Sequence, residues 1–288
     1  MLGGTAKYGG TLASMKRLAL LLLAILTLSA AAAAGTIAYY RFEDGPSGSV
    51  ASSITDSSGN GNTGAVLSGG PKYNSSVPIS PIPQTGAPDL LSLGFGTGDS
   101  AAFNYAFPFD TLTNATLEFW VDPTSTVGEN DIFWTTTGSA DTNRFNIRIA
   151  PGGAFGVDYR TPTGTLHSLL LGGSVPAGQW SFIALVKSGN TYTAYINGTQ
   201  ITHNDVSPNL PTSTGWTING RATEQPASCC QFAGLIDEVR LSDQALAPSQ
   251  FLNTPEPVSS LLLLSGLAAL VAMRRAGSGR HFRSRVGL

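Results

Sequence analysis

The chain has 288 residues, which is enough for one large domain with a self-sufficient apolar core. Charged residues make up 12% of the chain, well below the average of about 25%, and this argues against a solvating disordered chain and against a nucleic-acid binder. Between residues 35 and 254, eight basic residues stand against seventeen acidic ones, a net charge of −9 that disfavours phosphate backbones as partners. We expect no nucleic-acid partner.

The first 34 residues have the order of an export signal. Residues 15–17 (Met-Lys-Arg) are a short basic segment, 18–28 an apolar run and 29–34 a stretch of small residues. This order predicts a secretory signal peptide over residues 1–34, with cleavage after Ala34; a buried core helix is the alternative. A signal peptide does not need the Gly-rich residues before Met15, so the start codon is left open between Met1 and Met15.

Short apolar or alternating runs recur along the middle of the chain, and helical apolar spacing is found only at 245–252. We expect strands over residues 37–42, 91–95, 115–121, 131–134, 145–149, 155–159, 166–171, 180–186, 192–196, 216–218 and 232–241. Strands at such spacing, separated by Gly, Asn and Pro, indicate an antiparallel sandwich or barrel. Parallel α/β architecture is excluded because no crossover helices are present.

The segment 180–201 predicts the most definite part of this sheet. Apolar residues occupy both faces of 180–186, with Phe182 on one face and Ile183 on the other, as expected for a strand in the centre of a sheet. Turn residues at 188–190 and the Asn197-Gly198 pair then predict a three-stranded meander.

The two cysteines, Cys229 and Cys230, are neighbours in the sequence. Adjacent Cα atoms lie closer than the usual range for a disulfide, yet export places the pair in an oxidising compartment. We favour a vicinal disulfide that stiffens the loop before the last strand; intermolecular bonds and a reduced pair are the alternatives.

The C-terminal segment 253–288 has the order of a sorting signal. Pro255, Glu256 and Pro257 precede an uncharged apolar stretch at 258–273, which ends at Arg274 and Arg275. At about 1.5 Å per residue this stretch is short for a bilayer core of about 30 Å, and the following arginines predict a cytoplasmic tail with the domain outside.

The string TPEPVSSLLLLSGLAALVAMRRA resembles a PEP-CTERM sorting signal, which is read by a membrane transpeptidase of the exosortase type. The resemblance implies a bacterial envelope protein that is membrane-anchored at least transiently. Thr254 stands where Val is usual, and residues 277–288 extend beyond the normal stop. A plain C-terminal membrane anchor is the alternative.

Five segments resemble LamG-like jelly rolls of the concanavalin A-like lectin and glucanase superfamily, in the order of that family. They are AYYRFEDG, DSSGNGNTG, TLEFWVDP, GQWSFIALVKSGNTYTAYINGTQI and FAGLIDEVRLSDQALAPSQF. The resemblance covers nearly all of a domain predicted over residues 35–252. It implies an all-β sandwich of two curved antiparallel sheets, a jelly roll with adjacent first and last strands, here flanked by apolar helical segments at both ends of the chain.

That adjacency brings residues 41–44 and 56–62 close to Asp237 and Glu238. Carboxylates that meet at a rim need a cation, and hard oxygen ligands suit Ca²⁺. In the relatives a structural calcium often sits here, and carried over by position its ligands are Asp44, Asp56, Asn60 and Asp237, with backbone carbonyls nearby. The alternative is an ordinary Asx turn at Asp56 and an ion pair from Asp237 to an arginine.

The glucanases of this superfamily carry three acids on one strand as E-x-D-x-E or E-x-D-x-x-E. Here Glu118 and Asp122 share a face, but Trp120 takes the middle position. On a regular strand at about 3.4 Å per residue the two acids are about 13 Å apart, beyond either glycosidase geometry. Asp237 and Glu238 are adjacent, so we expect them on opposite faces. The sequence therefore predicts no catalytic residues and no enzyme.

Relatives hold glycans or protein ligands on the concave sheet or on rim loops. Trp134, Tyr159 and Trp216 are candidates for stacking on sugars, with core packing as the alternative for each. The resemblance implies an exported, surface-tethered, non-catalytic module that binds glycan, exopolysaccharide or extracellular matrix. A glycoside hydrolase with its acid pair elsewhere and a ligand-free structural matrix protein are the alternatives.

Overall fold

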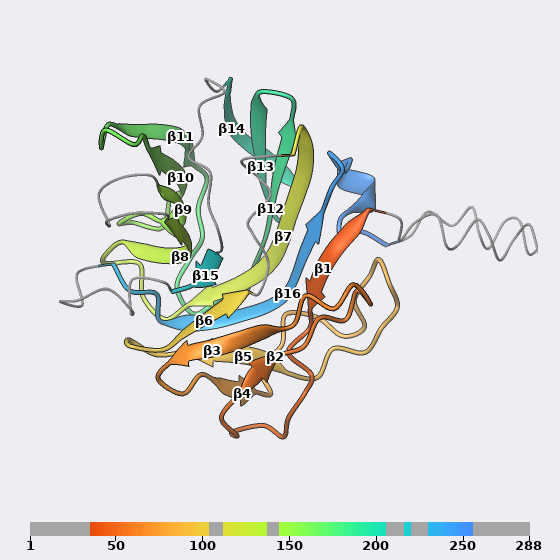
Figure 1. Cartoon of the computed structure of the whole chain (residues 1–288). Coiled ribbons are helices and arrows are strands. Elements are labelled where there is room, and N and C mark those ends of the chain that lie inside the picture. Colours follow the sequence, from red (N-terminus) through yellow and green to blue (C-terminus); the bar gives the residue numbers. More distant parts are fainter. Residues whose placement is uncertain (1–34, 104–111, 137–143, 206–215, 220–229, 256–288) are drawn as a thin grey trace, which may run out of the picture.

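The computed structural model describes residues 35–103, 112–136, 144–205, 216–219 and 230–255, which form two antiparallel β-sheets packed face to face (Figure 1). The predicted all-β sandwich is confirmed. The apolar segments predicted as helices at both ends of the chain lie outside the described residues.

The first sheet, sheet A, contains β14, β13, β12, β7, β16, β5 and β4 in spatial order, and β1 also pairs with β16. The bounds of these strands are Thr199–Asp205, Thr191–Ile196, Ser181–Ser188, Asn114–Pro123, Gly234–Ser242, Ser92–Phe95 and Lys72–Asn74, with β1 at Thr36–Tyr40.

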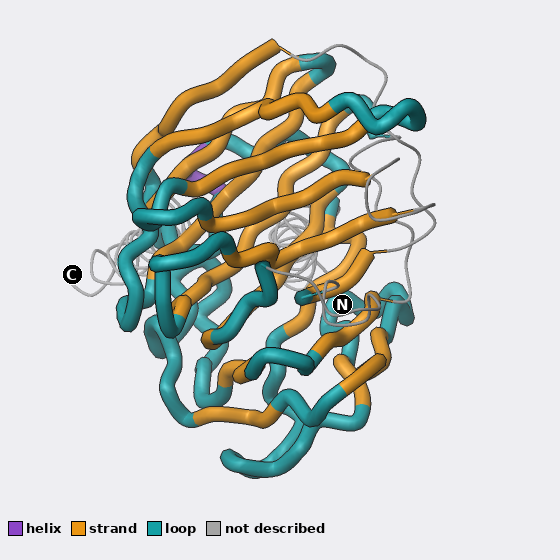
Figure 2. The backbone as a smooth tube through the Cα atoms, turned by 90° about the vertical axis from the view of Figure 1, so that its left-hand side faces the viewer, coloured by secondary structure: helices purple, strands orange, loops and turns teal. Residues whose placement is uncertain are grey.

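The second sheet, sheet B, contains β11, β10, β9, β8, β15, β6, β3 and β2 in spatial order. Their bounds are Leu166–Gly172, Phe155–Arg160, Arg144–Ile149, Asn130–Thr136, Trp216–Ile218, Ser100–Phe103, Gly64–Ser68 and Ser53–Ile54. In Figure 2 the strands lie side by side and most of the loops gather at their ends.

The first and last strands are neighbours, as expected: β1 pairs antiparallel with β16, with Tyr39 opposite Arg240 and Tyr40 opposite Val239. The central position of β12 is also confirmed, since it lies between β7 and β13, and β12, β13 and β14 form the predicted meander.

Four strands that the sequence did not predict, β2, β3, β4 and β6, are two to five residues long. Their sequences, SI, GAVLS, KYN and SAAF, are too short to show a clear alternation of apolar and polar residues. Each is defined by pairing with a neighbour, as β4 is with β5 and β3 with β6.

The main core lies between the sheets and includes Leu117, Phe119 and Val121 from one face of β7. A second apolar cluster lies on the outer face of sheet A, where Trp120 and Phe182 pack with Phe251. Phe251 belongs to residues 244–254, here called the C-terminal strap, which contains one short 3₁₀ helix, η2, at Pro248–Gln250. The apolar spacing at 245–252 therefore belongs to a packed strap and not to a longer helix.

Candidate functional site

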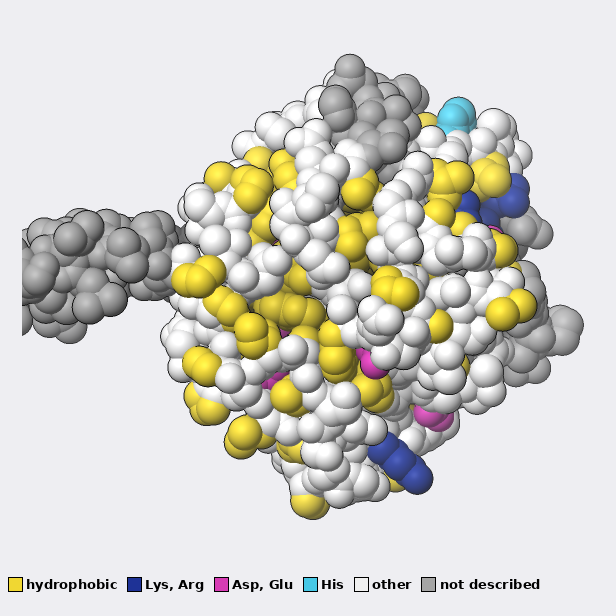
Figure 3. All heavy atoms as spheres, turned by 180° about the vertical axis from the view of Figure 1, so that it is seen from behind, with side chains coloured by type: hydrophobic (Ala, Val, Ile, Leu, Met, Phe, Trp, Pro, Cys, Tyr) yellow, Lys and Arg dark blue, Asp and Glu magenta, His cyan; other side chains and the backbone are white. Residues whose placement is uncertain are grey.

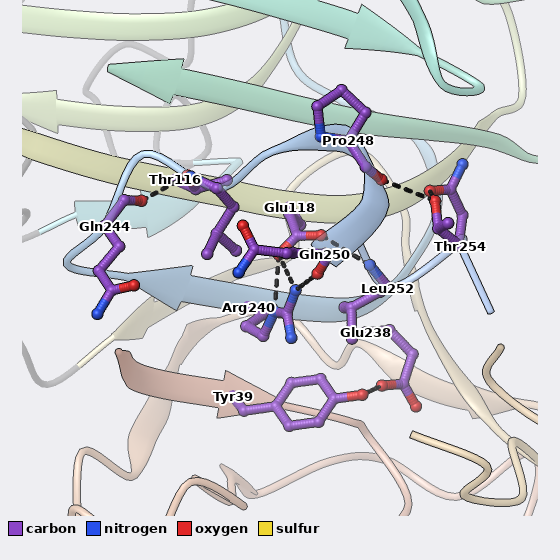
Figure 4. Close-up of polar contacts among 12 residues, drawn as sticks. Tyr39, Thr116, Glu118, Glu238, Arg240, Gln244, Pro248, Gln250, Leu252 and Thr254 are labelled. Atoms are coloured by element: carbon purple, nitrogen blue, oxygen red, sulfur yellow. Dashed lines mark hydrogen bonds and ion pairs between the residues drawn. The ribbon is translucent and has the colours of Figure 1, made fainter. Parts of the chain in front are cut away.

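Glu118 is the residue of this chain that corresponds to the first acid of the glucanase motif E-x-D-x-E. It lies buried under the C-terminal strap (Figure 4). Its side chain accepts hydrogen bonds from Arg240 Nε at 2.7 Å and from the Leu252 backbone N–H at 2.8 Å, and Arg240 Nη2 donates to the Gln250 carbonyl at 2.9 Å. Glu118 is 0% exposed, and burial raises its pKa while Arg240 lowers it. The pair therefore fastens the strap to sheet A.

A second group of acids on the same face is here called the acidic cluster: Glu43, Asp89, Asp237 and Glu238. One carboxylate oxygen from each of Glu43, Asp89 and Glu238 lies within 4.8 Å of the others. Asp237 precedes Glu238 on β16 and is counted with them; burial raises its pKa most, followed by charge repulsion from Asp89 and Glu238. Asp89 is 1% exposed and Asp237 and Glu238 are 0% exposed.

A β-bulge explains how two consecutive acids reach one cluster. The register between β16 and β7 shifts between Asp237 and Arg240, and Glu238 has a φ of +49°, in the left-handed region. The extra residue breaks the alternation of side chains, so the expectation that Asp237 and Glu238 lie apart on opposite faces was wrong. A positive φ at a glutamate gives no signal in the sequence.

The cluster contains carboxylate oxygens without partners. Glu238 is bonded to Arg41 Nε at 3.0 Å and to the Tyr39 hydroxyl, which points at it in Figure 4. Neither oxygen of Asp89 and only one oxygen of Asp237 has a hydrogen-bond partner among the described residues. Leaving such groups buried and unpaired costs free energy.

Without a cation, burial shifts the pKa values of three of these acids upward. Burial and then Glu238 raise the pKa of Asp89 to about 8. Burial raises the pKa of Glu238 to about 7, although Tyr39 and Arg41 act to lower it. Burial also places the pKa of Asp237 well above its ordinary value. Several carboxylate oxygens at one point are the donor set that hard divalent cations prefer, so the cluster fits Ca²⁺.

Of the four predicted calcium ligands, only Asp237 belongs to the acidic cluster. Asp56 accepts backbone N–H bonds from Tyr39, Ser58 and Asn62 at 2.8–3.0 Å. Although burial acts to raise the pKa of Asp56, these hydrogen bonds hold it below its usual value. Asp56 thus forms an Asx turn, the alternative considered for it.

Asp44 and Asn60 also make bonds of their own. Asp44 accepts a bond from the Thr55 N–H at 3.3 Å, and the Asn60 amide donates to the Thr36 and Ile37 carbonyls. Glu43 and Asp89 were missed by sequence reasoning. Glu43 stands in the quoted RFED motif, whereas nothing around Asp89 marks it as a ligand.

The three candidate stacking residues are buried. Trp134 and Tyr159 are each 3% exposed and Trp216 is 1% exposed. Tyr159 and Trp216 belong to the main core, and the guanidinium of Arg144 lies 4.7 Å from the centre of the Trp134 ring. In this conformation the alternative of core packing describes all three.

A further group of possible ligand atoms, from Glu129, Asp131 and Cys230, is less suited to a metal. Cys230 is disulfide-bonded, so it offers no thiolate. Cys229, the other cysteine of the chain, lies outside the described residues. Glu129 is also bonded to Arg148, at 3.4 Å.

The outer face of sheet A also carries an open hollow of about 590 Å³ where β4, β5, β16 and β7 lie side by side. Its lining residues are Gly70, Lys72, Asn74, Gly94, Phe95, Gly96, Asp99, Asp122, Thr124, Gly178, Gly234 and Leu235. This volume lies within the range of ligand sites, about 300–1,000 Å³.

The sequence profile of the concanavalin A-like lectin/glucanases superfamily matches residues 95–250, more than half of the chain. The chain belongs to this superfamily. The five segments of the sequence that resemble this superfamily implied two antiparallel sheets with adjacent first and last strands, and the structure has both features. A search of curated proteins gives no match.

Solved structures share the fold at low sequence identity. Domain 4 of AbnA, a GH43 extracellular arabinanase from Geobacillus stearothermophilus, solved in complex with arabinotriose, has a TM-score of 0.54 at 17% identity and covers 76% of this chain and 97% of its own. The binding domain of botulinum neurotoxin DC, solved in complex with SialylT, has a TM-score of 0.52 at 14% identity and covers 77% of this chain. The match spans about half of that toxin domain (50%).

The predicted sorting motif begins where the described chain ends. Pro255 is exposed, and Glu256, Pro257, Arg274 and Arg275 lie outside the described residues. Among the described residues, no helix has the length and hydrophobicity needed to cross a membrane.

Proposed function

We propose that this chain is an exported, surface-tethered, non-catalytic module that binds glycan, exopolysaccharide or extracellular matrix. The observation that carries the proposal is the position of Glu118. The acid best placed for catalysis is buried, paired with Arg240 and covered by the strap, so no substrate reaches it. A glycosidase needs two accessible carboxyl groups about 5–9.5 Å apart.

Structural neighbours support a carbohydrate ligand. The arabinanase domain was solved with arabinotriose and the toxin binding domain with SialylT. The surface seen in Figure 3 is sparsely charged and consists mostly of hydrophobic and uncharged polar groups, which suits a neutral ligand better than a polyanion.

A glycan array probed with the purified full chain tests this proposal. We expect saturable binding to one class of glycan and no release of reducing ends from laminarin, agar or arabinan. Turnover that is lost in Glu118→Gln, with the variant still folded, would support the glycoside hydrolase instead. A folded chain that binds no glycan or matrix polymer would favour the ligand-free structural protein.

We also propose that the tail tethers the module. The last packed residue of the strap is Thr254, whose hydroxyl donates to the Pro248 carbonyl at 2.8 Å, so the Pro255–Pro257 motif begins directly beside the folded domain. An extracellular location would agree with relatives such as the arabinanase. Expression with and without an exosortase, followed by mass measurement, tests this; the tail is expected to be lost only with the enzyme present.

The acidic cluster is proposed to hold a structural Ca²⁺, with Glu43, Asp89, Asp237 and Glu238 supplying oxygen ligands. The cation would neutralise the unpaired oxygens of Asp89 and Asp237 and so join β16 to the loop before β5. Calorimetric titration of the chelator-treated chain with Ca²⁺ is expected to show one site that Asp89→Asn abolishes and Asp56→Asn, in the Asx turn, retains. The opposite pattern would return the site to the turn at 56–62.

A further inference from the structure

A row of four lining residues, one from each of four neighbouring strands, crosses the hollow on sheet A. Lys72 of β4 lies opposite Gly94 of β5, Gly94 lies opposite Leu235 of β16, and Leu235 lies opposite Asp122 of β7. A row across a sheet points its side chains to one face. Here Gly94 leaves a gap in the row between the side chains of Lys72 and Leu235.

Two glycines line the hollow, Gly234, where β16 approaches the β7 backbone closely, and Gly94, which has no side chain to occupy the space. A Cβ atom on Gly234 would meet the Asp122 carbonyl oxygen at 2.3 Å, so this position admits no side chain. A Cβ on Gly94 would lie 3.2 Å from Leu235 Cδ2 and 3.4 Å from the Lys72 carbonyl oxygen, which a small shift relieves. A longer side chain at residue 94 would therefore fill the hollow without straining the backbone.

The polar groups around the hollow include one unpaired acceptor and one unpaired donor. Oδ1 of Asp122 is a buried atom without a hydrogen-bond partner among the described residues. Burial raises the pKa of this carboxyl, and the backbone N–H groups of Gln179 and Gly178 act to lower it. Oδ1 of Asn74 accepts the Ser76 N–H at 2.8 Å, which leaves the Asn74 amide nitrogen as a donor. The side chains of Lys72 and Thr124 are exposed.

Both carboxylate oxygens of Asp99 have hydrogen-bond partners in the loops that line the hollow. Its two oxygens accept the backbone N–H groups of Gly70 and Gly96, each at 2.8 Å. With Asp99 and Asp122 against Lys72, the lining carries more negative than positive charge. Such a lining repels anionic ligands, while mixed donors and acceptors match the hydroxyl groups of a neutral sugar.

We propose that this hollow is the ligand site of the module and binds an uncharged oligosaccharide, with Asp122 and Asn74 bonding to its hydroxyl groups. This inference rests on the proposed binding function and names a site for it. It replaces Trp134, Tyr159 and Trp216, whose rings are buried, with the unpaired oxygen of Asp122 and the exposed amide of Asn74 in the lining of the hollow.

Titration calorimetry of the full chain with arabinotriose, laminaritriose and cellotriose tests the proposal, with a heparin-derived oligosaccharide as the anionic comparison. Asp122→Asn and Gly94→Gln are each expected to weaken binding of the preferred neutral sugar about tenfold or more, the scale of one lost charge-assisted hydrogen bond. The matched controls are Asp243→Asn, at an exposed aspartate beyond β16, and Gly128→Gln, at a glycine with nothing within 4 Å of an added Cβ. Both are expected to stay within twofold of the natural chain.

The outcomes separate the site from the function. Sugar binding that survives in folded Asp122→Asn and Gly94→Gln would overturn the site and leave the binding function standing. A folded chain that binds none of the neutral sugars would overturn the site and its ligand class, and failure on the wider glycan array would remove the binding function as well. Preference for the anionic oligosaccharide would overturn the ligand class. If Gly94→Gln does not fold, Asp122→Asn, which keeps the shape of the side chain, decides the question.

Discussion

Two buried acidic sites lie on the outer face of sheet A, Glu118 of β7 and the acidic cluster around Asp237 of β16, and they differ in whether their carboxylate oxygens have partners. Glu118 has a guanidinium and a backbone N–H on its carboxylate. Asp89 and Asp237 have three oxygens between them with no partner among the described residues. The carboxylate of Glu118 thus has its hydrogen-bond partners and its counter-charge within the fold, whereas the unpaired oxygens of Asp89 and Asp237 need protons or a cation. Burial alone therefore does not identify a functional acid. Buried carboxylate oxygens without hydrogen-bond partners are the better indication.

The largest loss of stability is expected from breaking the ion pair of Glu118 with Arg240. Glu118→Gln leaves Arg240 buried without a counter-charge, and breaking a buried pair in this way typically costs about 3–5 kcal/mol. Denaturant unfolding of the full chain measures the loss. The matched control is Glu129→Gln, whose partly exposed pair with Arg148 should contribute about 1 kcal/mol or less. Equal losses in the two variants would contradict the role given to Glu118.

The second largest effect on stability is expected from Ca²⁺ binding at the acidic cluster. A ligand at one hundred times its dissociation constant raises the free energy of unfolding by about 2.7 kcal/mol. We therefore expect Ca²⁺ to raise the melting temperature of the chelator-treated chain, and Asp89→Asn to remove that rise. A melting temperature that is the same in excess chelator and in Ca²⁺ would exclude the cation from the fold.

A smaller effect is expected from pH in the presence of chelator. The folded-state pKa values of Asp89, about 8, and Glu238, about 7, lie above the ordinary values of 3.8 and 4.5. At pH values between the ordinary and the raised pKa, the folded chain therefore binds more protons than the unfolded chain. Their contribution to the free energy of unfolding is thus fully present below about pH 4 and is lost as the pH rises to 8. Melting scans from pH 5 to pH 8.5 should show this fall, and Asp89→Asn should reduce it. A melting temperature that rises over that range would contradict the arrangement.

Much of the fold could be predicted from local patterns. The two-faced apolar run around Phe182 and Ile183 identified the central strand β12, and the turn at Asn197 identified the hairpin of β13 and β14. The pairing of the first and last strands of the domain followed from the family resemblance and is confirmed by β1 and β16. The short strands such as β4 and β6 could not be predicted, because their residues become strands only by pairing with neighbours.

The site was less predictable, because it depends on distances between residues far apart in the chain. Asp89 and Glu43 are 46 positions apart, and Glu238 lies nearly 150 positions beyond Asp89. The bulge at Glu238 that lets Asp237 and Glu238 converge is a backbone conformation without a sequence signature. The hollow likewise depends on the register that places Gly94 between Lys72 and Leu235.

By itself, the sequence determined the all-β class, the central hairpin and the superfamily, because side-chain alternation and turn residues act over a few positions. Only the tertiary structure decided which acids are satisfied, which aromatic rings are buried and where a ligand has room. These properties arise when strands from opposite ends of the chain are brought into register, and the charge and packing around each side chain are then set by its neighbours in space.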